Sequence, residues 1–361
     1  MKFVDVNPFF FPYEGGIERR MHDTARLLSE KGHDVTILTS QLKGTPTEEK
    51  TEYGYRIIRL KSRFIDIYNP PFVSSKHVLE TLKSMDADVI NYNYRWAPSY
   101  NKDIARYDGP KVFTYHNMWG EGSGIQKKFS MMNDNMFGRK VLPTFDHIIC
   151  VSKFVQDDII SRGVPREKTS FIPSCLSSIP AYTNSPEGNY ILSLGRMVAT
   201  KGLKYLVEAM QDVDCKLIMC GKGPEYKRLE KQISKLNLDD RIEMRGYVSE
   251  EEKERLMAEC KFFVMPSEFE SFGLAAVELM SHGRPMVCSD ADGLPETVGN
   301  AGIIVPKKDA SALTKAINEL LNDDIKRHDM GCNAIERAKF YTWPSHIDNL
   351  EQILKNTAMK R

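Results

Sequence analysis

Short apolar runs alternate with stretches of helical periodicity along almost the whole chain, and this alternation restricts the fold more than any other feature. Residues 2–6 form an apolar run, and residues 17–28 are apolar at helical spacing before a helix stop at Gly32. Residues 35–39 are rich in β-branched side chains and predict the next strand. Such a strand–helix–strand unit implies parallel strands joined by a crossover helix.

The same pattern occurs twice, in two series of strands. At 361 residues the chain exceeds the roughly 250–300 residues at which single cores stop growing. Residues 173–188 are rich in Pro, Ser and Gly without any period, which is typical of a linker. We therefore predict two doubly wound α/β domains, 1–176 and 177–343, with a cleft at the carboxyl ends of their strands. Further strand-like runs lie at 55–60, 89–92, 112–115, 147–151, 190–194, 216–220, 242–244, 262–266, 286–288 and 302–305.

Composition excludes several classes of protein. Hydrophobic residues make up 41% and charged residues 27%, as in soluble folded chains. The balance of 50 Lys and Arg against 49 Asp and Glu argues against a nucleic-acid partner. There is no signal peptide and no apolar run of membrane-spanning length, so we expect a cytoplasmic protein for which contact with the inner membrane surface stays open. The seven cysteines lack zinc-site spacing and are interpreted as reduced core thiols.

The segment that begins with Gly195 and Arg196 and ends with Lys201 and Gly202 lies between a strand and a helix. Glycines permit close backbone approach there, and the two cations can converge on one anionic group such as a diphosphate. A glycine turn with two solvated cations fits the segment equally well.

A second strand–loop–helix segment covers 266–278. Glu270 is expected in the loop and Glu278 in the second turn of the helix, where Gly273 and Leu274 offer N–H groups at its positive end. This segment could hold sugar hydroxyls, phosphate and ribose together. The alternative is a loop charge and a helix-surface acid.

Three smaller loops follow other strands of the second half. If the predicted doubly wound topology is right, the loops Gly221–Pro224 and Asp292–Glu296 border the same cleft as the two segments above. Each is also an ordinary turn sequence. The backbone from Gly246 to Val248 could face a nucleotide base.

In the first half, Gly15 and Gly16 precede a helix and could form an anion-binding nest or a tight turn. His116 directly follows the strand 112–115 and is expected to project into the cleft, although a lone histidine is more often structural. The aromatic run from Phe9 to Tyr13 could form the wall of an acceptor site or pack in a buried loop.

The stretch 126–140 combines apolar and basic side chains. Met131, Met132, Met136 and Phe137 are flanked by basic residues at 127, 128, 139 and 140. Such a surface suits a lipid interface, and ordinary packing at the edge of a cleft is the alternative.

In order and spacing, these motifs resemble the retaining glycosyltransferases of family 4. That family has the GT-B architecture, in which two Rossmann-like domains face each other across a cleft. The resemblance also implies that a helix in 344–361 returns to the first domain. It is carried by Gly15–Arg20, Gly32–Val35, the strand ending in His116, Gly195–Gly202, Glu270–Glu278 and Gly293–Glu296.

The resemblance implies roles for matching residues. Arg196 and Lys201 would bind the donor diphosphate, Glu278 the ribose, and Glu270 the transferred sugar, with His116 near its anomeric carbon. Four residues are thus predicted to be catalytic: His116, Arg196, Lys201 and Glu270. The predicted donor-binding residues are Gly16, Gly195, Gly221, Gly246, Val248, Ser271, Phe272, Gly273, Leu274 and Glu278, and the predicted acceptor-binding residues are Tyr13 and Gly15.

The sequence thus predicts transfer of a hexose from a UDP- or GDP-linked sugar to a hydroxyl of a glycan or lipid-linked acceptor, with retention of configuration. The two cations would stabilise the departing diphosphate, so neither a metal nor another cofactor is expected. One alternative is a catalytically silent subunit that binds nucleotide sugars or glycans. Another is epimerisation or phosphorolysis on the same fold.

Overall fold

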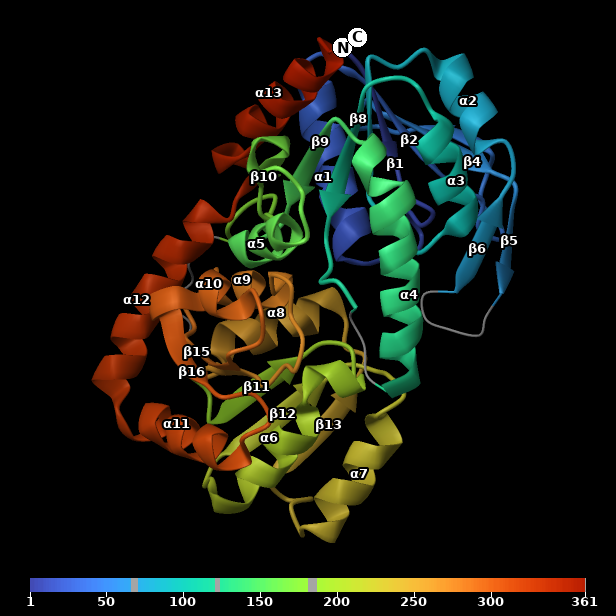
Figure 1. The fold of residues 1–361 in the computed structure, drawn as a ribbon. Coiled ribbons are helices and arrows are strands. Elements are labelled where there is room, and N and C mark those ends of the chain that lie inside the picture. Colours follow the sequence, from blue (N-terminus) through green and yellow to red (C-terminus); the bar gives the residue numbers. More distant parts are fainter. Residues whose placement is uncertain (66–70, 121–123, 181–186, 361) are drawn as a thin grey trace. The chain divides into compact units, whose positions relative to one another are not determined.

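The computed structural model describes residues 1–65, 71–120, 124–180 and 187–360, and the chain divides into two compact units. Unit 1 comprises Met1–Ser174 and Trp343–Arg361, and unit 2 comprises Cys175–Thr342. Each unit has its own sheet flanked by helices (Figure 1). Part of the predicted linker, residues 181–186, lies outside the described residues.

Unit 1 is built on an eight-stranded sheet with the order β10-β9-β8-β7-β1-β2-β4-β3. All neighbouring strands are parallel except β3, which pairs antiparallel with β4 at one edge. A separate antiparallel pair, β5 and β6, lies outside this sheet. The strands are β1 (Lys2–Val6), β2 (Asp34–Ser40), β3 (Glu48–Lys50), β4 (Arg56–Leu60), β5 (Ser62–Ile65), β6 (Phe72–Ser75), β7 (Val89–Tyr92), β8 (Lys111–Tyr115), β9 (His147–Cys150) and β10 (Thr169–Phe171).

Helix α1 follows the predicted period. Met21, Ala25 and Leu28 are buried on its inner face, and the chain turns out of the helix at Gly32, where φ is +85°. Helix α13 packs beside α1 and against β7 and β8, so the last helix is part of unit 1 (Figure 1). The helices of unit 1 are α1 (Gly16–Glu30), α2 (Val78–Met85), α3 (Pro98–Arg106), α4 (Gly124–Lys140), α5 (Lys153–Ser161) and α13 (Ile347–Ala358).

Unit 2 contains a six-stranded parallel sheet with the order β13-β12-β11-β14-β15-β16. These are the six strands that the sequence predicts for the second half. Their bounds are β11 (Tyr190–Leu194), β12 (Lys216–Cys220), β13 (Ile242–Gly246), β14 (Phe263–Met265), β15 (Met286–Ser289) and β16 (Gly302–Val305). The helices are α6 (Leu203–Ala209), α7 (Tyr226–Lys235), α8 (Glu250–Glu259), α9 (Leu274–Met280), α10 (Leu294–Val298), α11 (Ala310–Asn322) and α12 (Asp324–Phe340).

Both sheets have a point at which the strand order reverses. In unit 1 the chain adds β2 on one side of β1 and later β7 on the other, and in unit 2 it adds β12 and then β14 on opposite sides of β11. In each unit, the crossover helices on the two sides of this point lie on different faces of the sheet. The carboxyl end of the central strand, β1 or β11, therefore borders a crevice of the kind in which α/β proteins bind ligands. The doubly wound α/β class predicted from the sequence is confirmed.

The central strands are buried on both faces, as expected for parallel sheets. In β1 the four residues after Lys2 are buried, and three of them, Phe3, Val4 and Val6, are apolar. The exception is Asp5, a carboxylate that is only 2% exposed. A buried charge is costly unless it is hydrogen-bonded, so Asp5 must be held by specific partners.

Chain passages near the unit boundaries are tied by specific contacts. In unit 1, Arg20 donates to the carbonyl oxygen of Pro173 at 2.5 Å, and its guanidinium lies 4.9 Å from the centre of the Trp343 ring. In unit 2, the Leu176 amide donates to the carbonyl oxygen of Tyr341 at 2.9 Å. The segments that begin and end unit 2 in sequence therefore lie side by side.

Candidate active site

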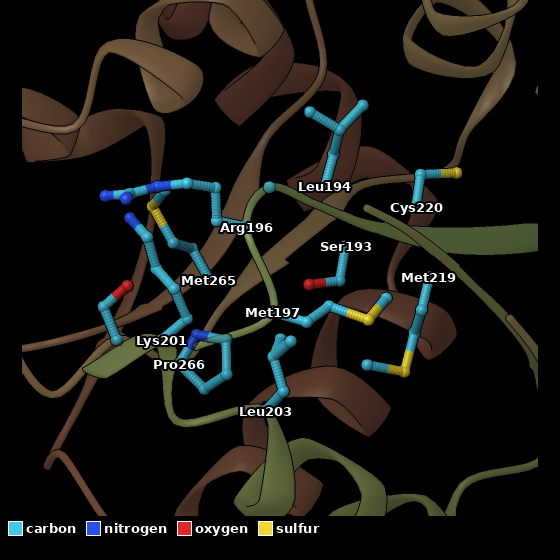
Figure 2. Close-up of a pocket in the computed structure, with 12 residues that line it drawn as sticks. Ser193, Leu194, Arg196, Met197, Lys201, Leu203, Met219, Cys220, Met265 and Pro266 are labelled. Atoms are coloured by element: carbon cyan, nitrogen blue, oxygen red, sulfur yellow. The ribbon is translucent and has the colours of Figure 1, made fainter. Parts of the chain in front are cut away.

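The loops after β11 and β14 form a small pocket at the switch point of unit 2 (Figure 2). Its lining includes Gly195, Arg196 and Lys201 from the first loop and Pro266 and Ser267 from the second. The pocket has a volume of about 10 Å³, enough for a single water. The enclosed part of this pocket is therefore too small for a nucleotide.

Close backbone contacts fix the shape of these loops. A Cβ on Gly221 would lie 1.8 Å from the carbonyl oxygen of Gly195, and one on Gly202 would lie 2.0 Å from that of Pro266. The φ angles of Gly221 and Gly202 are +141° and +62°, values that favour glycine. These glycines hold the loops after β11, β12 and β14 together.

Lys201 forms an ion pair with Glu270, which brings two of the three predicted catalytic residues of unit 2 into direct contact. Their side chains are 23% and 16% exposed, so solvent screens the pair only in part. Arg196 is exposed, and Figure 2 shows its side chain extending in the same direction as that of Lys201. Two cations thus line the pocket, and one of them is paired with a carboxylate.

The loop after β14 is fastened to the loop after β15. The Glu270 amide donates to Asp292 Oδ2 at 3.2 Å, and the Gly293 amide donates to the Glu270 carbonyl oxygen at 2.9 Å. Phe272 is buried and its carbonyl oxygen accepts from the hydroxyl of Thr297. Hydrogen bonds to its backbone amide and to its carbonyl oxygen thus fix Glu270 in the loop, where the sequence predicts it.

Helix α9 begins at Leu274, after Gly273 in the left-handed conformation at φ +95°. Glu278 is its fifth residue and is half-buried, while Ala276, Val277, Leu279 and Met280 are buried. The glutamate therefore lies on the side of the helix that faces away from the core. Ser271 is also half-buried in the preceding turn.

The loops after β12 and β13 are joined to each other. The Gly221 amide donates to the carbonyl oxygen of Gly246 at 2.6 Å. Tyr247 is 69% exposed, and Lys222 Nζ lies 5.9 Å from the centre of its ring. Val248 is half-buried and remains the predicted contact for a nucleotide base.

The structure contradicts a nest at Gly15 and Gly16. Gly15 is extended, with φ −167° and ψ 175°, and Gly16 is the first residue of α1, so the alternating backbone handedness of a nest is not formed. Both glycines are exposed. A Cβ on Gly15 would lie 2.4 Å from Glu18 Oε2, which shows that this carboxylate reaches back to the start of the helix.

Glu18 is a buried acid that sequence reasoning missed. It is 5% exposed and accepts from Asn7 Nδ2 at 3.1 Å. Burial raises the pKa of Glu18 to about 7, although hydrogen bonds from its own backbone amide and from Asn7 act in the opposite direction. The signal in the sequence was an acid three residues into a helix after paired glycines.

His116 lies just beyond β8 and is half-buried. Its Nε2 lies 3.0 Å from Asn93 Oδ1, at the end of the neighbouring β7. Burial lowers the pKa of His116 well below 6.5, and Arg20 and Arg95 lower it further, so the ring is neutral at physiological pH. Whether it faces a cleft stays a prediction.

The aromatic run after β1 divides into a buried and a partly exposed part. Phe9 and Phe10 are buried, whereas Tyr13 is half-exposed. The Tyr13 ring packs 4.9 Å from that of Phe9, which also contacts Tyr94 at 5.5 Å. Buried packing describes the two phenylalanines, and Tyr13 stays the predicted acceptor contact.

Helix α4 exposes most of the side chains expected for a lipid surface. Met131, Met132 and Met136 are exposed and border an open groove of about 570 Å³ with Lys128 and Arg139. The inclusion of Phe137 was wrong. That ring is 1% exposed and packs 5.0 Å from Phe113.

A buried ion pair sets the orientation of α4. Asp134 is 0% exposed and accepts from Arg95 Nε at 2.7 Å, while Trp96 Nε1 and the Gly120 amide also donate to it. The helix therefore turns Asp134 and Phe137 inward and the methionines outward. Phe129, which is 64% exposed, joins the outward side.

The other expectations concern cysteines, metals and membranes. Six cysteines are buried or half-buried and form no disulfide. The prediction of a core thiol was wrong for Cys332, which is exposed on α12. Three Asp-x-Asp triplets occur, at 86–88, 212–214 and 290–292, and in the third, Asp290 and Asp292 accept hydrogen bonds from the backbone amides of Lys307 and Glu270. In the described part of the chain, no three His, Cys, Asp or Glu residues are grouped so that they could hold a metal. No helix among the described residues is long and apolar enough to span a membrane.

Comparisons with known proteins match both halves of the chain. Residues 14–177 match Glycosyltransferase Family 4, and residues 178–337 match Glycosyl transferases group 1. An uncharacterized glycosyltransferase of Methanocaldococcus jannaschii is 27% identical over 353 residues, which cover 95% of each chain. A phosphatidyl-myo-inositol mannosyltransferase of Mycobacterium leprae is 25% identical, with coverage of 99% of this chain and 97% of its own.

Solved structures share the fold. A sucrose-phosphate synthase from Thermosynechococcus elongatus has a TM-score of 0.82 at 21% identity, covering all of both chains. Anabaena HepE in complex with UDP and glucose has a TM-score of 0.75 at 19% identity, covering 99% of this chain and 100% of its own. With both halves matched and the fold shared over its length, the chain belongs to glycosyltransferase family 4 and has the GT-B fold.

Proposed function

We propose that this chain transfers a hexose from a nucleoside diphosphate sugar to an acceptor hydroxyl, with retention of configuration and without a metal ion. The observation that carries the proposal is the placement of Arg196 and Lys201 on one loop at the switch point of unit 2, with Lys201 paired to Glu270. Negative charge develops on the diphosphate as the glycosidic bond breaks. Cations fixed on a strand-end loop stabilise that charge without reorganising during the reaction.

The remaining roles follow the family resemblance. Glu278 binds the ribose hydroxyls, Glu270 the transferred sugar, and Val248 the base, while His116 contacts the sugar. The leaving phosphate accepts the proton of the acceptor hydroxyl, so Glu270 acts in binding and not as a nucleophile. A uridine donor is supported by the UDP in the complex of HepE, and guanosine is the other candidate.

For the acceptor, we propose a glycan or lipid-linked hydroxyl presented at a membrane surface. The support is the exposed side of α4, where Met131, Met132 and Met136 lie between basic side chains at 127–128 and 139–140. The Mycobacterium leprae relative is named for a phospholipid acceptor, which agrees with this surface. The sequence predicts a cytoplasmic chain and leaves contact with the inner membrane surface open, and such an acceptor would be met at that surface.

The test begins with thermal unfolding of the full chain in UDP, GDP, ADP and their sugar conjugates, with Mg²⁺ or with EDTA. A ligand at 100 times its Kd adds about 2.7 kcal/mol of stability, so a bound nucleotide is readily detected. The donor thus identified is then incubated with lipid-linked and soluble acceptors, and the anomer formed is determined by NMR.

We expect stabilisation by one nucleotide in EDTA and a glycoside with the anomeric configuration of the donor. An inverted product would contradict retention, and a requirement for Mg²⁺ would contradict metal independence. Stabilisation without transfer or donor hydrolysis would favour the silent subunit, and an epimer or free sugar phosphate would indicate the other GT-B reactions.

A further inference from the structure

Five polar side chains extend along one face of the central strands of unit 1. Asp5 on β1 is paired in register with Asn91 on β7, and Asn93 follows two residues later on the same side. On the neighbouring β8, Val112 is paired in register with Asn91, and Thr114 and His116 follow on the same side two and four residues later. Asp5, Asn91, Asn93 and Thr114 are each at most 6% exposed, so this row of polar groups is enclosed between the sheet and its covering elements.

Hydrogen bonds connect the row from Asp5 outward. Asp5 Oδ1 accepts from Asn91 Nδ2 at 2.9 Å and from Asn93 Nδ2 at 2.6 Å. A carboxylate offers only acceptors, so both amide groups must turn their N–H bonds toward it. Their carbonyl oxygens consequently point to the other neighbours in the row.

These oxygens then determine what can lie opposite them. Asn91 Oδ1 accepts from the hydroxyl of Thr114 at 2.8 Å. Asn93 Oδ1 lies 3.0 Å from His116 Nε2, and an oxygen can only accept there, so Nε2 must carry a hydrogen. A neutral imidazole with its hydrogen on Nε2 keeps the lone pair on Nδ1.

Charges around the row maintain this arrangement. Arg20 on α1 faces both Asp5 and His116, and Arg95 adds to the positive potential at the imidazole. A second proton on His116 is therefore disfavoured, and its pKa is lowered well below 6.5. Burial raises the pKa of Asp5 to about 6, while Asn93, Asn91 and Arg20 lower it, so the carboxylate is ionised above that pH.

We propose that Asp5 and Asn93 are positioning residues, which hold His116 as its Nε2–H tautomer so that Nδ1 accepts a hydrogen bond from a hydroxyl of the transferred sugar. The inference rests on the proposed function, because it takes His116 as a sugar contact. It adds a requirement: the second imidazole nitrogen is an acceptor, so the donor sugar must offer a hydroxyl hydrogen to it. Neither Asp5 nor Asn93 touches the sugar in this arrangement.

The first experiment reads the tautomer directly and does not depend on activity. The full chain is labelled with ¹⁵N at its histidine rings, and the His116 resonances are identified by their loss in His116→Gln. We expect hydrogen on Nε2 in the unsubstituted protein and a shift toward the Nδ1–H form in Asn93→Leu. Hydrogen on Nδ1 in the unsubstituted protein, or an unchanged tautomer in Asn93→Leu, would overturn the proposal even if the chain is an active transferase.

A charge swap provides the kinetic test. Asn93→Asp places two carboxylates side by side and should lower kcat roughly 10- to 100-fold, as loss of an orienting partner typically does. In the double variant Asp5→Asn with Asn93→Asp, the new amide donates to the new carboxylate, which still accepts from Nε2. We expect kcat to recover about tenfold relative to Asn93→Asp, the coupling typical of neighbouring residues. No recovery in a folded double variant would contradict the relay.

The pH profile and a matched control complete the test. The kcat of the unsubstituted protein should fall as the pH drops through about 6, since protonated Asp5 can donate and no longer fixes the Asn93 amide. Asp5→Asn should abolish that acid limb.

Ser40→Ala is the matched control. It removes an equally buried hydroxyl of β2 that is hydrogen-bonded to Ser75 and Tyr100, outside the row, and it should change only thermal stability. An acid limb that persists in Asp5→Asn would count against Asp5 as the titrating group, whereas normal transfer by His116→Gln would contradict the sugar contact alone.

Discussion

Lys201 and Glu270 are paired across 69 positions of sequence, and their ion pair joins the loop after β11 to the loop after β14. Each is proposed to bind a different part of the donor. A diphosphate that attracts Lys201 weakens the hold of the lysine on Glu270 and leaves its oxygens available to sugar hydroxyls. In the proposed site, binding of the phosphates and binding of the sugar would therefore be coupled through one contact.

Lys201→Ala should raise the activation free energy by about 2–4 kcal/mol and so lower kcat. This is the usual effect of losing one preorganised charge-stabilising group. Lys222→Ala is the control, because Lys222 is an exposed cation on the neighbouring loop that faces Tyr247. Steady-state kinetics with saturating donor measures both variants. Near-normal turnover of Lys201→Ala would eliminate its role at the diphosphate.

Gly221→Ala should destabilise unit 2 more than Gly195→Ala. The two glycines have almost the same φ, +141° and +144°, but only at Gly221 would a Cβ meet another atom, the Gly195 carbonyl oxygen. Both substitutions incur backbone strain of about 1–3 kcal/mol, and Gly221→Ala must also move a loop. Urea unfolding followed by a unit 2 probe should show the larger loss for Gly221→Ala, and equal losses would mean that the loops are not held by this contact.

Stability should depend on pH through Glu18. Its pKa is about 7 in the folded protein against 4.5 in the reference state, so the folded state binds the proton more tightly. The contribution is fully present below about pH 4.5 and is lost as the pH rises through 7, with a total of up to about 3 kcal/mol.

Glu18→Gln should remove that loss, so the variant gains stability relative to the unsubstituted protein between pH 5 and pH 8. Glu30→Gln, at the exposed far end of the same helix, is the control and should leave the pH dependence unchanged. Free energies of unfolding from urea titrations at both pH values provide the comparison. Parallel pH profiles for Glu18→Gln and the unsubstituted protein would show that Glu18 does not titrate in this range.

Binding to liposomes should depend on the outward side of α4. Flotation with anionic vesicles should carry the protein upward, and added salt should weaken this because Lys128 and Arg139 are exposed charges. Phe129→Ser with Met132→Ser should abolish it, since each removes an apolar side chain that is 64% exposed. Ile325→Ser removes a side chain 77% exposed on α12 and should have no effect. Absence of flotation with any vesicle would remove the support for a membrane-presented acceptor.

Much of the fold could be predicted from the sequence because parallel strands are buried on both faces and appear as continuous apolar runs. Each run that the sequence predicts as a strand is one in the structure. Four short strands, β3, β5, β6 and β10, were missed, since three or four residues do not form a continuous apolar run. The glycine-containing loops were found because they follow the apolar runs directly.

The polar interior of unit 1 could not be predicted in the same way. Asp5 and Asn93 are 88 residues apart, and only the register of β1 and β7 brings them together. The inward side of α4 was not predicted either, because an aspartate such as Asp134 normally marks the solvent side of a helix. Its pairing with Arg95 reverses that rule and turns Phe137 inward with it.

Helix α13 has a consequence for the order in which the protein is made. Unit 1 begins with the first residue, yet the helix that covers β7 and β8 is encoded after the whole of unit 2. During synthesis on the ribosome, the earlier unit therefore emerges with an apolar area of its sheet uncovered, and the later unit has all its strands first. The part of the chain translated first is the last to be finished, so a truncation after residue 342 would expose the core of unit 1 and leave unit 2 intact.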